Sequence, residues 1–331
     1  EIIDESLKMI ESDDNLQWSV KQPMLKSFPF LTNTKGETVN LGAPTEKNLG
    51  SGVKNKSERK ETKTIMEFLA ENPDVDVNNA WERCWGIQTG IIGRIRERFE
   101  VSKHPSCEGR DYFTSEVHPE NGQLEGSFNS YTGENMDWLV HSWLGNRKRS
   151  ILDINATAFL GQETRVPHLT VIFGTIPRLY FYAEYTPRMD LRTNPDYLNK
   201  YYEPVNKDFL EFRDHPNWTR FVSHGTYLRS FMSPICVSSH AELNDENIDY
   251  CETYLKTFID RWFAWLDEAE TVPLSERDAL QTYDLKVREL GYRNDPMNVL
   301  PIQIFGAEEA NRMLEMRIGV DQIKAVKGRW K

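Results

Sequence analysis

The chain has 331 residues, of which 39% are hydrophobic and 11% aromatic, so it can bury a substantial core. Its net charge of −11 argues against non-specific nucleic-acid binding, which depends on clustered cations. No run approaches the roughly 18 uninterrupted apolar residues of a membrane helix, and the N-terminus lacks the basic-then-apolar pattern of a secretory signal. We therefore expect a soluble intracellular protein without a transmembrane segment. The sequence starts at Glu1 and cannot show whether a leader was removed.

Common cofactor and metal motifs do not occur in the sequence. There is no GxGxxG after a strand, no GxxxxGK[ST], no GxSxG and no HExxH, and the seven histidines show no metal-ligand spacing. The cysteines are scattered without a CxxC, which disfavours zinc and iron–sulfur sites and predicts free thiols in a reducing compartment: Cys84, Cys107, Cys236 and Cys251.

The first 64 residues are polar and weakly periodic, and we expect an extension or flexible segment there. Residues 65–331 are predicted to form a single domain. A helical pattern begins near Thr64, and a longer one over 77–99 places aromatic and aliphatic residues on one stripe. The opposite face carries Arg94, Arg96 and Arg98, which is either a solvated surface or a docking patch for an acidic partner.

Apolar runs separated by turn residues predict five strands, over 124–131, 136–144, 150–160, 168–175 and 179–185. The last three are joined by short turns, which favours an antiparallel meander because a parallel pairing needs a long crossover. In the second strand, alternation places His141 and Trp143 on one face.

Helical segments dominate the rest of the chain. Asn194 is suited to cap a helix that starts at Pro195, and further helices are predicted over 205–213, 244–269, 275–290, 307–316 and 320–326, with Gly291 as a C-terminal cap. One more strand is expected over 227–237. The order of elements predicts an α/β/α sandwich with a central antiparallel sheet flanked by helices.

Three groups of residues resemble a known family. The segment LYFYAEYTPRMDL over 179–191, followed by NPDYL over 194–198, is similar to a strand-turn-helix of red chlorophyll catabolite reductase. The segment YLRSFMSPICV over 227–237 resembles a later strand of that family, with its Arg-Ser and Ser-Pro pairs. Asn294-Asp295 ahead of Phe305-Gly306 resembles the related ferredoxin-dependent bilin reductases.

The resemblance covers roughly 136–319 and implies a pocket between the sheet and the C-terminal helices. It implies reduction of a linear tetrapyrrole, a bilin or an opened chlorophyll catabolite, with electrons from reduced ferredoxin and no bound metal or organic cofactor. An extended conjugated substrate can hold an unpaired electron while a side chain donates a proton. By motif position, Asp295 would be the acid or the partner of a pyrrole nitrogen and Asn294 its neighbour. Asn294-Asp295-Pro296 is also an ordinary turn sequence.

One position departs from the family pattern. Five residues after a proline such as Pro167, the family has an Asp or Glu that faces the substrate, whereas this chain has Ile172. His168 or Glu184 could donate the proton instead, and alternation favours His168, which shares a face with Ile172. A lone histidine in a strand is also commonly structural.

Further candidate substrate contacts are Arg229, for a substrate carboxylate or an internal salt bridge, together with His141, Trp143 and Ser233. The basic residues Arg147, Lys148 and Arg149 could receive an acidic electron donor. Because the carboxylate at Ile172 is absent, two alternatives stay open: a cofactor-free isomerase or lyase acting on another aromatic small molecule, and a non-catalytic pigment-binding protein. A chloroplast-stroma and a cytoplasmic location fit the sequence equally.

Overall fold

The computed structural model describes residues 53–55, 79–107, 113–115, 124–146, 151–175 and 178–327. Its centre is a ten-stranded sheet in the order β1-β3-β4-β5-β6-β7-β8-β10-β9, with β2 paired to β4. Every pairing is antiparallel. The strands are β1 Val53–Asn55, β2 Ser102–Lys103, β3 Phe113–Ser115, β4 Leu124–Gly133, β5 Met136–Asn146, β6 Ile151–Leu160, β7 His168–Gly174, β8 Leu179–Thr186, β9 Thr219–Arg220 and β10 Val237–Ala241.

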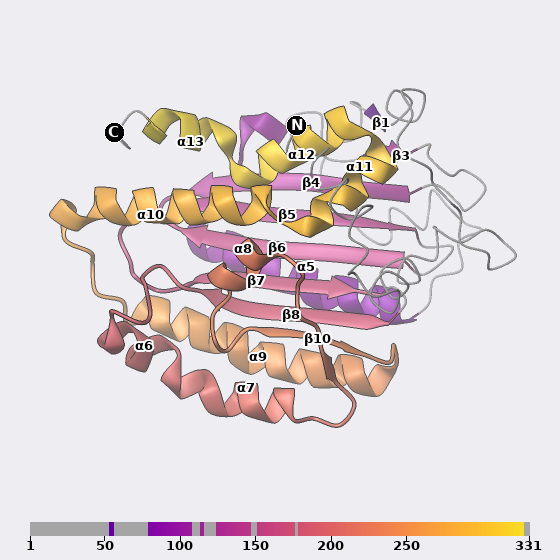
Figure 1. The fold of residues 1–331 in the computed structure, drawn as a ribbon, viewed down its shortest axis with the longest axis horizontal. Coiled ribbons are helices and arrows are strands. Elements are labelled where there is room, and N and C mark those ends of the chain that lie inside the picture. The colour runs from indigo at the N-terminus through magenta and orange to yellow at the C-terminus, as the bar shows by residue number, and fades with distance from the viewer. Residues whose placement is uncertain are drawn as a thin grey trace, which may run out of the picture.

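Helices cover both faces of this sheet, which confirms the predicted α/β/α sandwich (Figure 1). They are α5 Asn79–Phe99, α6 Pro195–Tyr201, α7 Asn206–Arg213, α8 Thr226–Phe231, α9 Asp245–Asp267, α10 Leu274–Arg293, α11 Val299–Phe305, α12 Ala307–Ile318 and α13 Val320–Lys327, with 3-10 turns η2 Pro105–Cys107, η5 Glu203–Val205 and η6 Pro296–Asn298. Figure 1 shows α10 and α12 in front of the strands and α5 behind them. No helix in the described ranges is long and apolar enough to cross a membrane.

The face of the sheet under α5 and α9 is closed by apolar packing. The predicted stripe of α5 is buried there, and its Gln88 side chain donates a hydrogen bond to the Val171 carbonyl at 2.8 Å. From α9, the Trp262 indole donates to the Pro167 carbonyl at 2.9 Å. Each fully buried large side chain contributes on the order of 1.5–3 kcal/mol. This face therefore supplies most of the hydrophobic core.

The opposite face is covered by apolar side chains only in part. A second apolar cluster joins β4, β5 and the end of β6 to α11 and α12. The Trp138 indole in this cluster donates to the Met316 carbonyl at 3.1 Å. Gly319 ends α12 with a φ of +68°, a conformation that favours glycine. Apart from Phe159, the side chains that β6, β7 and β8 direct to this face belong to neither cluster.

A buried ion pair fixes α10 to the sheet. Arg188, just after β8, is 1% exposed and donates to Asp284 Oδ2 on α10 through Nη2 at 2.6 Å and Nε at 3.1 Å. The same guanidinium donates to the carbonyls of Thr164 and Gly161. These contacts hold the middle of α10 against the sheet.

Three local predictions were wrong. Residues 227–237 do not form one strand, because Thr226–Phe231 is the helix α8 and the strand β10 begins only at Val237. Gly291 does not end α10, which continues to Arg293 and is capped by Asn294. Asn194 does precede α6, but its side chain donates to the Asp190 carbonyl instead of accepting from the helix.

Two predicted segments lie outside the described residues. They are the helix near Thr64 and the basic group at 147–149. The polar extension over 1–64 is described only at β1, so the domain division stays a prediction.

Candidate active site

Polar side chains line the half-covered face of the sheet in parallel rows. Directly paired residues of antiparallel strands project to the same face, so the register defines each row. One row runs Ser142, Asn155, Ile172, Tyr182 and Ser238 across β5, β6, β7, β8 and β10. Ser142 and Ile172 are partly exposed. A polar, partly exposed strip on a central strand is typical of a binding surface rather than a core.

The next row contains a carboxylate that the sequence motifs did not identify. Asp153 of β6 is paired with Leu144 on one side and Gly174 on the other, and Gly174 is paired with Tyr180 of β8. Alternation along β6 puts Asp153, Asn155 and Thr157 on one face, and that periodicity is the signal by which Asp153 could have been found.

Asp295 lies at the C-terminal end of α10, above this row. It is half-buried, and its Oδ1 accepts the backbone N–H of Met297 at 2.9 Å, which caps η6. Burial raises the pKa of Asp295, while the Met297 N–H and Arg317 oppose that rise. Asn294 beside it donates to the Leu290 carbonyl at 2.8 Å and caps α10. The turn reading of this sequence and the acid role are therefore compatible.

Charge interactions place Asp153, Asp295, Arg317 and Tyr180 in one neighbourhood. Partial removal from bulk water by the surrounding protein raises the pKa of Asp153 to about 6, Arg317 opposes this rise and the Asp295 charge adds to it. The pKa of Tyr180 is raised mainly by burial and in part by both carboxylates. The Arg317 guanidinium lies over the Tyr292 ring at 5.0 Å. The site thus combines two carboxyl groups with a fixed cation.

Glu184 occupies the β8 side of the same face. Its Oε1 accepts the backbone N–H of Ser233 and its Oε2 accepts the Tyr182 hydroxyl. Burial raises the pKa of Glu184, and these hydrogen bonds and the nearby Ser233 hydroxyl partly offset the rise. Ser233 is 6% exposed, and its Oγ makes no hydrogen bond of ordinary geometry among the described residues. Such a hydroxyl on a binding face can turn to a ligand.

His168 lies on the predicted face but is engaged within the chain. Its Nδ1 accepts the Leu160 N–H at 3.0 Å, and its Nε2 lies 3.2 Å from Asp284 Oδ1. Burial lowers the pKa of His168 to about 4, although the Asp284 charge opposes this. With one nitrogen accepting from the backbone and the residue 1% exposed, His168 supports the position of α10. A role for His168 in proton donation stays a prediction.

His141 and Trp143 lie on the other face of β5. Trp143 packs edge-on against Trp81 and Trp85 of α5. His141 is 4% exposed, and burial together with Arg96 lowers its pKa to about 4. The sheet separates both side chains from Asp295, so the expectation that they share a pocket with it is corrected.

Arg229 belongs to the helix α8 and is exposed, with its Nη1 donating to the Ser223 carbonyl at 2.6 Å. It is therefore available at the surface near the end of α10, against which α8 packs through Phe231 and Gly291.

The arginines of α5 make their contacts within the chain. Arg94 Nη2 lies 2.7 Å from Asp260 Oδ1, and Arg98 pairs with Asp267. Arg96 lies over the Tyr131 ring at 4.7 Å. These contacts favour the solvated-surface reading over a docking patch.

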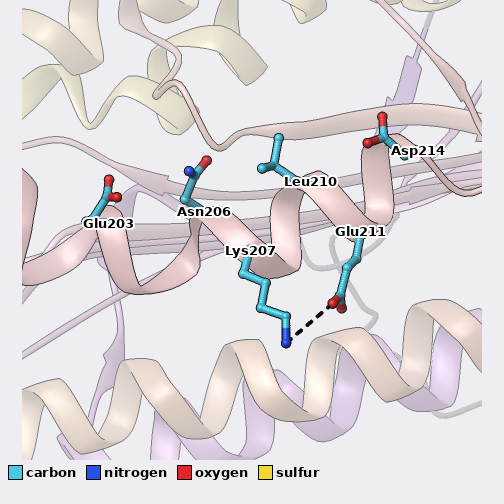
Figure 2. A pocket seen from close by; sticks show the side chains of 6 residues that line it. All are labelled: Glu203, Asn206, Lys207, Leu210, Glu211 and Asp214. Atoms are coloured by element: carbon cyan, nitrogen blue, oxygen red, sulfur yellow. Dashed lines mark ion pairs between the residues drawn. The ribbon is translucent and has the colours of Figure 1, made fainter.

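A surface depression lies away from this face. Figure 2 shows its lining side chains along α7, with an ion pair between Lys207 and Glu211 of this helix. It is lined by Glu203, Asn206, Lys207, Leu210, Glu211 and Asp214. Since α7 packs through Phe209 and Phe212 into the α5 and α9 side, the depression is remote from Asp295.

Comparisons with known proteins agree with the resemblance seen in the sequence. The chain is 24% identical over 218 residues to the chloroplastic red chlorophyll catabolite reductase of Arabidopsis thaliana, covering 59% of this chain and 67% of that protein. Its fold is similar to that of phytochromobilin synthase from tomato, solved in complex with biliverdin, with a TM-score of 0.61 at 16% identity over 70% of this chain and 82% of that one. The red chlorophyll catabolite reductase family matches residues 87–318, well over half of the chain. The protein therefore belongs to the red chlorophyll catabolite reductase family and is, as the resemblance implied, an oxidoreductase.

Proposed function

We propose that the protein reduces a linear tetrapyrrole, a bilin or an opened chlorophyll catabolite, with electrons supplied one at a time by reduced ferredoxin. The observation that carries the proposal is Asp295, an acid with a raised pKa above a polar, partly exposed sheet face, in a chain of this family. The family membership supports the substrate class, and the face over β6, β7 and β8 supports the place of binding.

The face suits a long, conjugated and polar molecule. Ile172 offers a half-buried apolar surface to a ring system, while Asn155 and Ser233 offer hydrogen-bonding groups to pyrrole nitrogens and carbonyl oxygens. Arg229 and Arg317 offer cations to substrate carboxylates, which guanidinium groups bind in bidentate geometry.

The chemistry requires two electrons and two protons. Each ferredoxin gives one electron, and the conjugated substrate holds the unpaired electron until a proton arrives. Asp295 donates a proton to the reduced substrate and recovers it from solvent. Because its pKa is raised, the carboxyl keeps its proton to a higher pH than an exposed aspartate does. The product is the substrate plus two hydrogen atoms.

An anaerobic assay with reduced ferredoxin and a panel of linear tetrapyrroles tests the proposal. We expect loss of the substrate absorbance and a product that is about two mass units heavier. In the Asp295→Asn variant, turnover should fall by about 10²–10⁴-fold, the range of general acid catalysis, while biliverdin still shifts its absorbance on binding.

The matched control is Asp196→Asn, an exposed carboxylate in the first turn of α6. Its turnover should equal that of the wild type. If Asp295→Asn also turned over at the wild-type rate, Asp295 would have no place in the chemistry.

The absence of a carboxylate at Ile172 favours a second candidate, a pigment-binding protein or a cofactor-free isomerase or lyase on this scaffold. Binding of biliverdin without ferredoxin-dependent turnover would support the pigment binder. Conversion of an aromatic substrate without any electron donor would support the isomerase or lyase.

A further inference from the structure

Asp153 is a further carboxyl on the proposed substrate face, besides Asp295 and Glu184, and proton donation by Asp295 does not use it. Its side chain is exposed even though β6 is the central strand of the β5-β6-β7 segment. Burial is described for nine of the ten residues of β6. Eight of these nine are buried, and the ninth, Asp153, is exposed. A charged side chain that reaches solvent from the middle of a sheet lies at an opening between the covering elements.

The space beside Asp153 is kept open by a glycine. Gly174, its partner on β7, has no side chain, and a Cβ there would lie 3.3 Å from Tyr180 Cβ. In this row, Gly174 separates the Asp153 side chain from the Tyr180 side chain. The Tyr180 hydroxyl lies 3.2 Å from Ser238 Oγ. A flat molecule can lie over Gly174 in contact with the side chains on either side of it.

Asp153 is also close to the position at which the expected carboxylate is missing. Asn155 is the direct partner of Ile172, and Asp153 is two residues further along β6 on the same face. At about 3.4 Å per residue, the two rows are about 7 Å apart. That displacement is small compared with the length of a linear tetrapyrrole, so a carboxyl at 153 reaches the same molecule at a neighbouring atom.

We propose, resting on the function proposed above, that Asp153 is the second proton donor of the reaction and takes the place of the carboxylate absent at Ile172. The first electron and a proton from Asp295 give a neutral substrate radical. The second electron and a proton from Asp153 complete the product, and one C–H or N–H bond is formed with each proton. Both carboxylates are then protonated again from solvent.

The charged and titratable groups around Asp153 suit this role. They are Asp295 at the end of α10, Arg317 on α12 and Tyr180 on β8. Solvent reaches the carboxyl, but the protein around it removes much of the bulk water, and this desolvation and the Asp295 charge raise its pKa to about 6 against the opposing effect of Arg317. Near that pH the group gives up a proton and recovers it readily, and at pH 7 about a tenth of it is still protonated.

The decisive experiment compares Asp153→Asn, Asp153→Glu and the control Asp196→Asn in the ferredoxin assay. For Asp153→Asn we expect unchanged biliverdin binding by absorbance and turnover reduced about 10²-fold or more. In the wild type, kcat should fall above pH 6 as Asp153 loses its proton, and this fall should be absent in Asp153→Asn. In that variant a one-electron-reduced substrate radical should accumulate and be visible by electron paramagnetic resonance. Asp153→Glu should restore much of the turnover, since it keeps the acid.

The outcomes separate this inference from the proposed function. A wild-type protein without turnover of any tetrapyrrole refutes both. An active wild type with an Asp153→Asn variant within about threefold of it, and with the same pH profile, refutes the role of Asp153 alone. Equal loss of biliverdin binding in the Asn and Glu variants would assign Asp153 to binding and would also refute proton donation.

Discussion

Replacing Asp284 with alanine should destabilise the protein strongly, because it leaves a charge buried without its partner. The Arg188 side chain is 0% exposed and the Asp284 side chain 10%. Without Asp284, the guanidinium keeps only the carbonyls of Thr164 and Gly161 as acceptors. Breaking a buried pair on one side costs about 3–5 kcal/mol.

A matched surface pair gives the comparison. Arg94 and Asp260 have side chains that are 48% and 52% exposed, and such pairs contribute only about 0–1 kcal/mol. Asp260→Ala should therefore change the free energy of unfolding by less than about 1 kcal/mol. Both variants remove an aspartate carboxylate that pairs with an arginine, and the two pairs differ in how deeply they are buried.

Urea unfolding followed by tryptophan fluorescence measures both free energies. The double variant Arg188→Met/Asp284→Leu should be more stable than Asp284→Ala, because it buries no unpaired charge. An Asp284→Ala variant that lost less than about 1 kcal/mol would show that the pair does not hold α10 in place. The position of α10 beside His168 would then have to be explained by other contacts.

Two further predictions concern the apolar faces. Gly319→Ala should cost at least about 1–2 kcal/mol, because alanine is strained at a φ of +68° and its Cβ would lie 3.1 Å from the Trp138 ring; a neutral result in urea unfolding would contradict the αL cap. His141 has a folded pKa of about 4, below its unfolded value of about 6.5, so the unfolded chain binds the extra proton and stability should fall as pH drops from 6.5 to 4. His141→Leu should have a shallower slope in that window, and an unchanged slope would show that His141 does not titrate in this way.

The sheet could be predicted closely from the sequence because its strands carry their own signals. Alternation in 136–144 and the turn-bounded runs at 150–160, 168–175 and 179–185 correspond to β5, β6, β7 and β8 within a few residues at each end. Residues 227–237 failed because a short apolar run bounded by polar residues is equally compatible with one helical turn and a strand. In the structure the first part of this segment is the helix α8, and its Phe231 packs against Gly291 of α10.

The site was predictable only where a motif identified it. Asp295 was found through its Asn-Asp sequence, and its position above the sheet follows from the Arg188–Asp284 pair, which joins residues 96 apart. Alternation ordered the residues within β5 but could not say which face carries the C-terminal helices. For that reason His141 and Trp143 were grouped with Asp295, although α5 covers them.

The carboxyl groups already present on the substrate face, Asp153 among them, explain why position 172 is apolar. Asp153, Asp295 and Glu184 already share one face, and removal from bulk water raises the pKa of each. A further carboxylate at position 172, paired directly with Asn155 and Tyr182, would add like charge to this face and raise these pKa values further. Ile172 avoids that cost and leaves an apolar contact for the substrate. The large core on the α5 and α9 side supplies the stability that allows this face to stay polar.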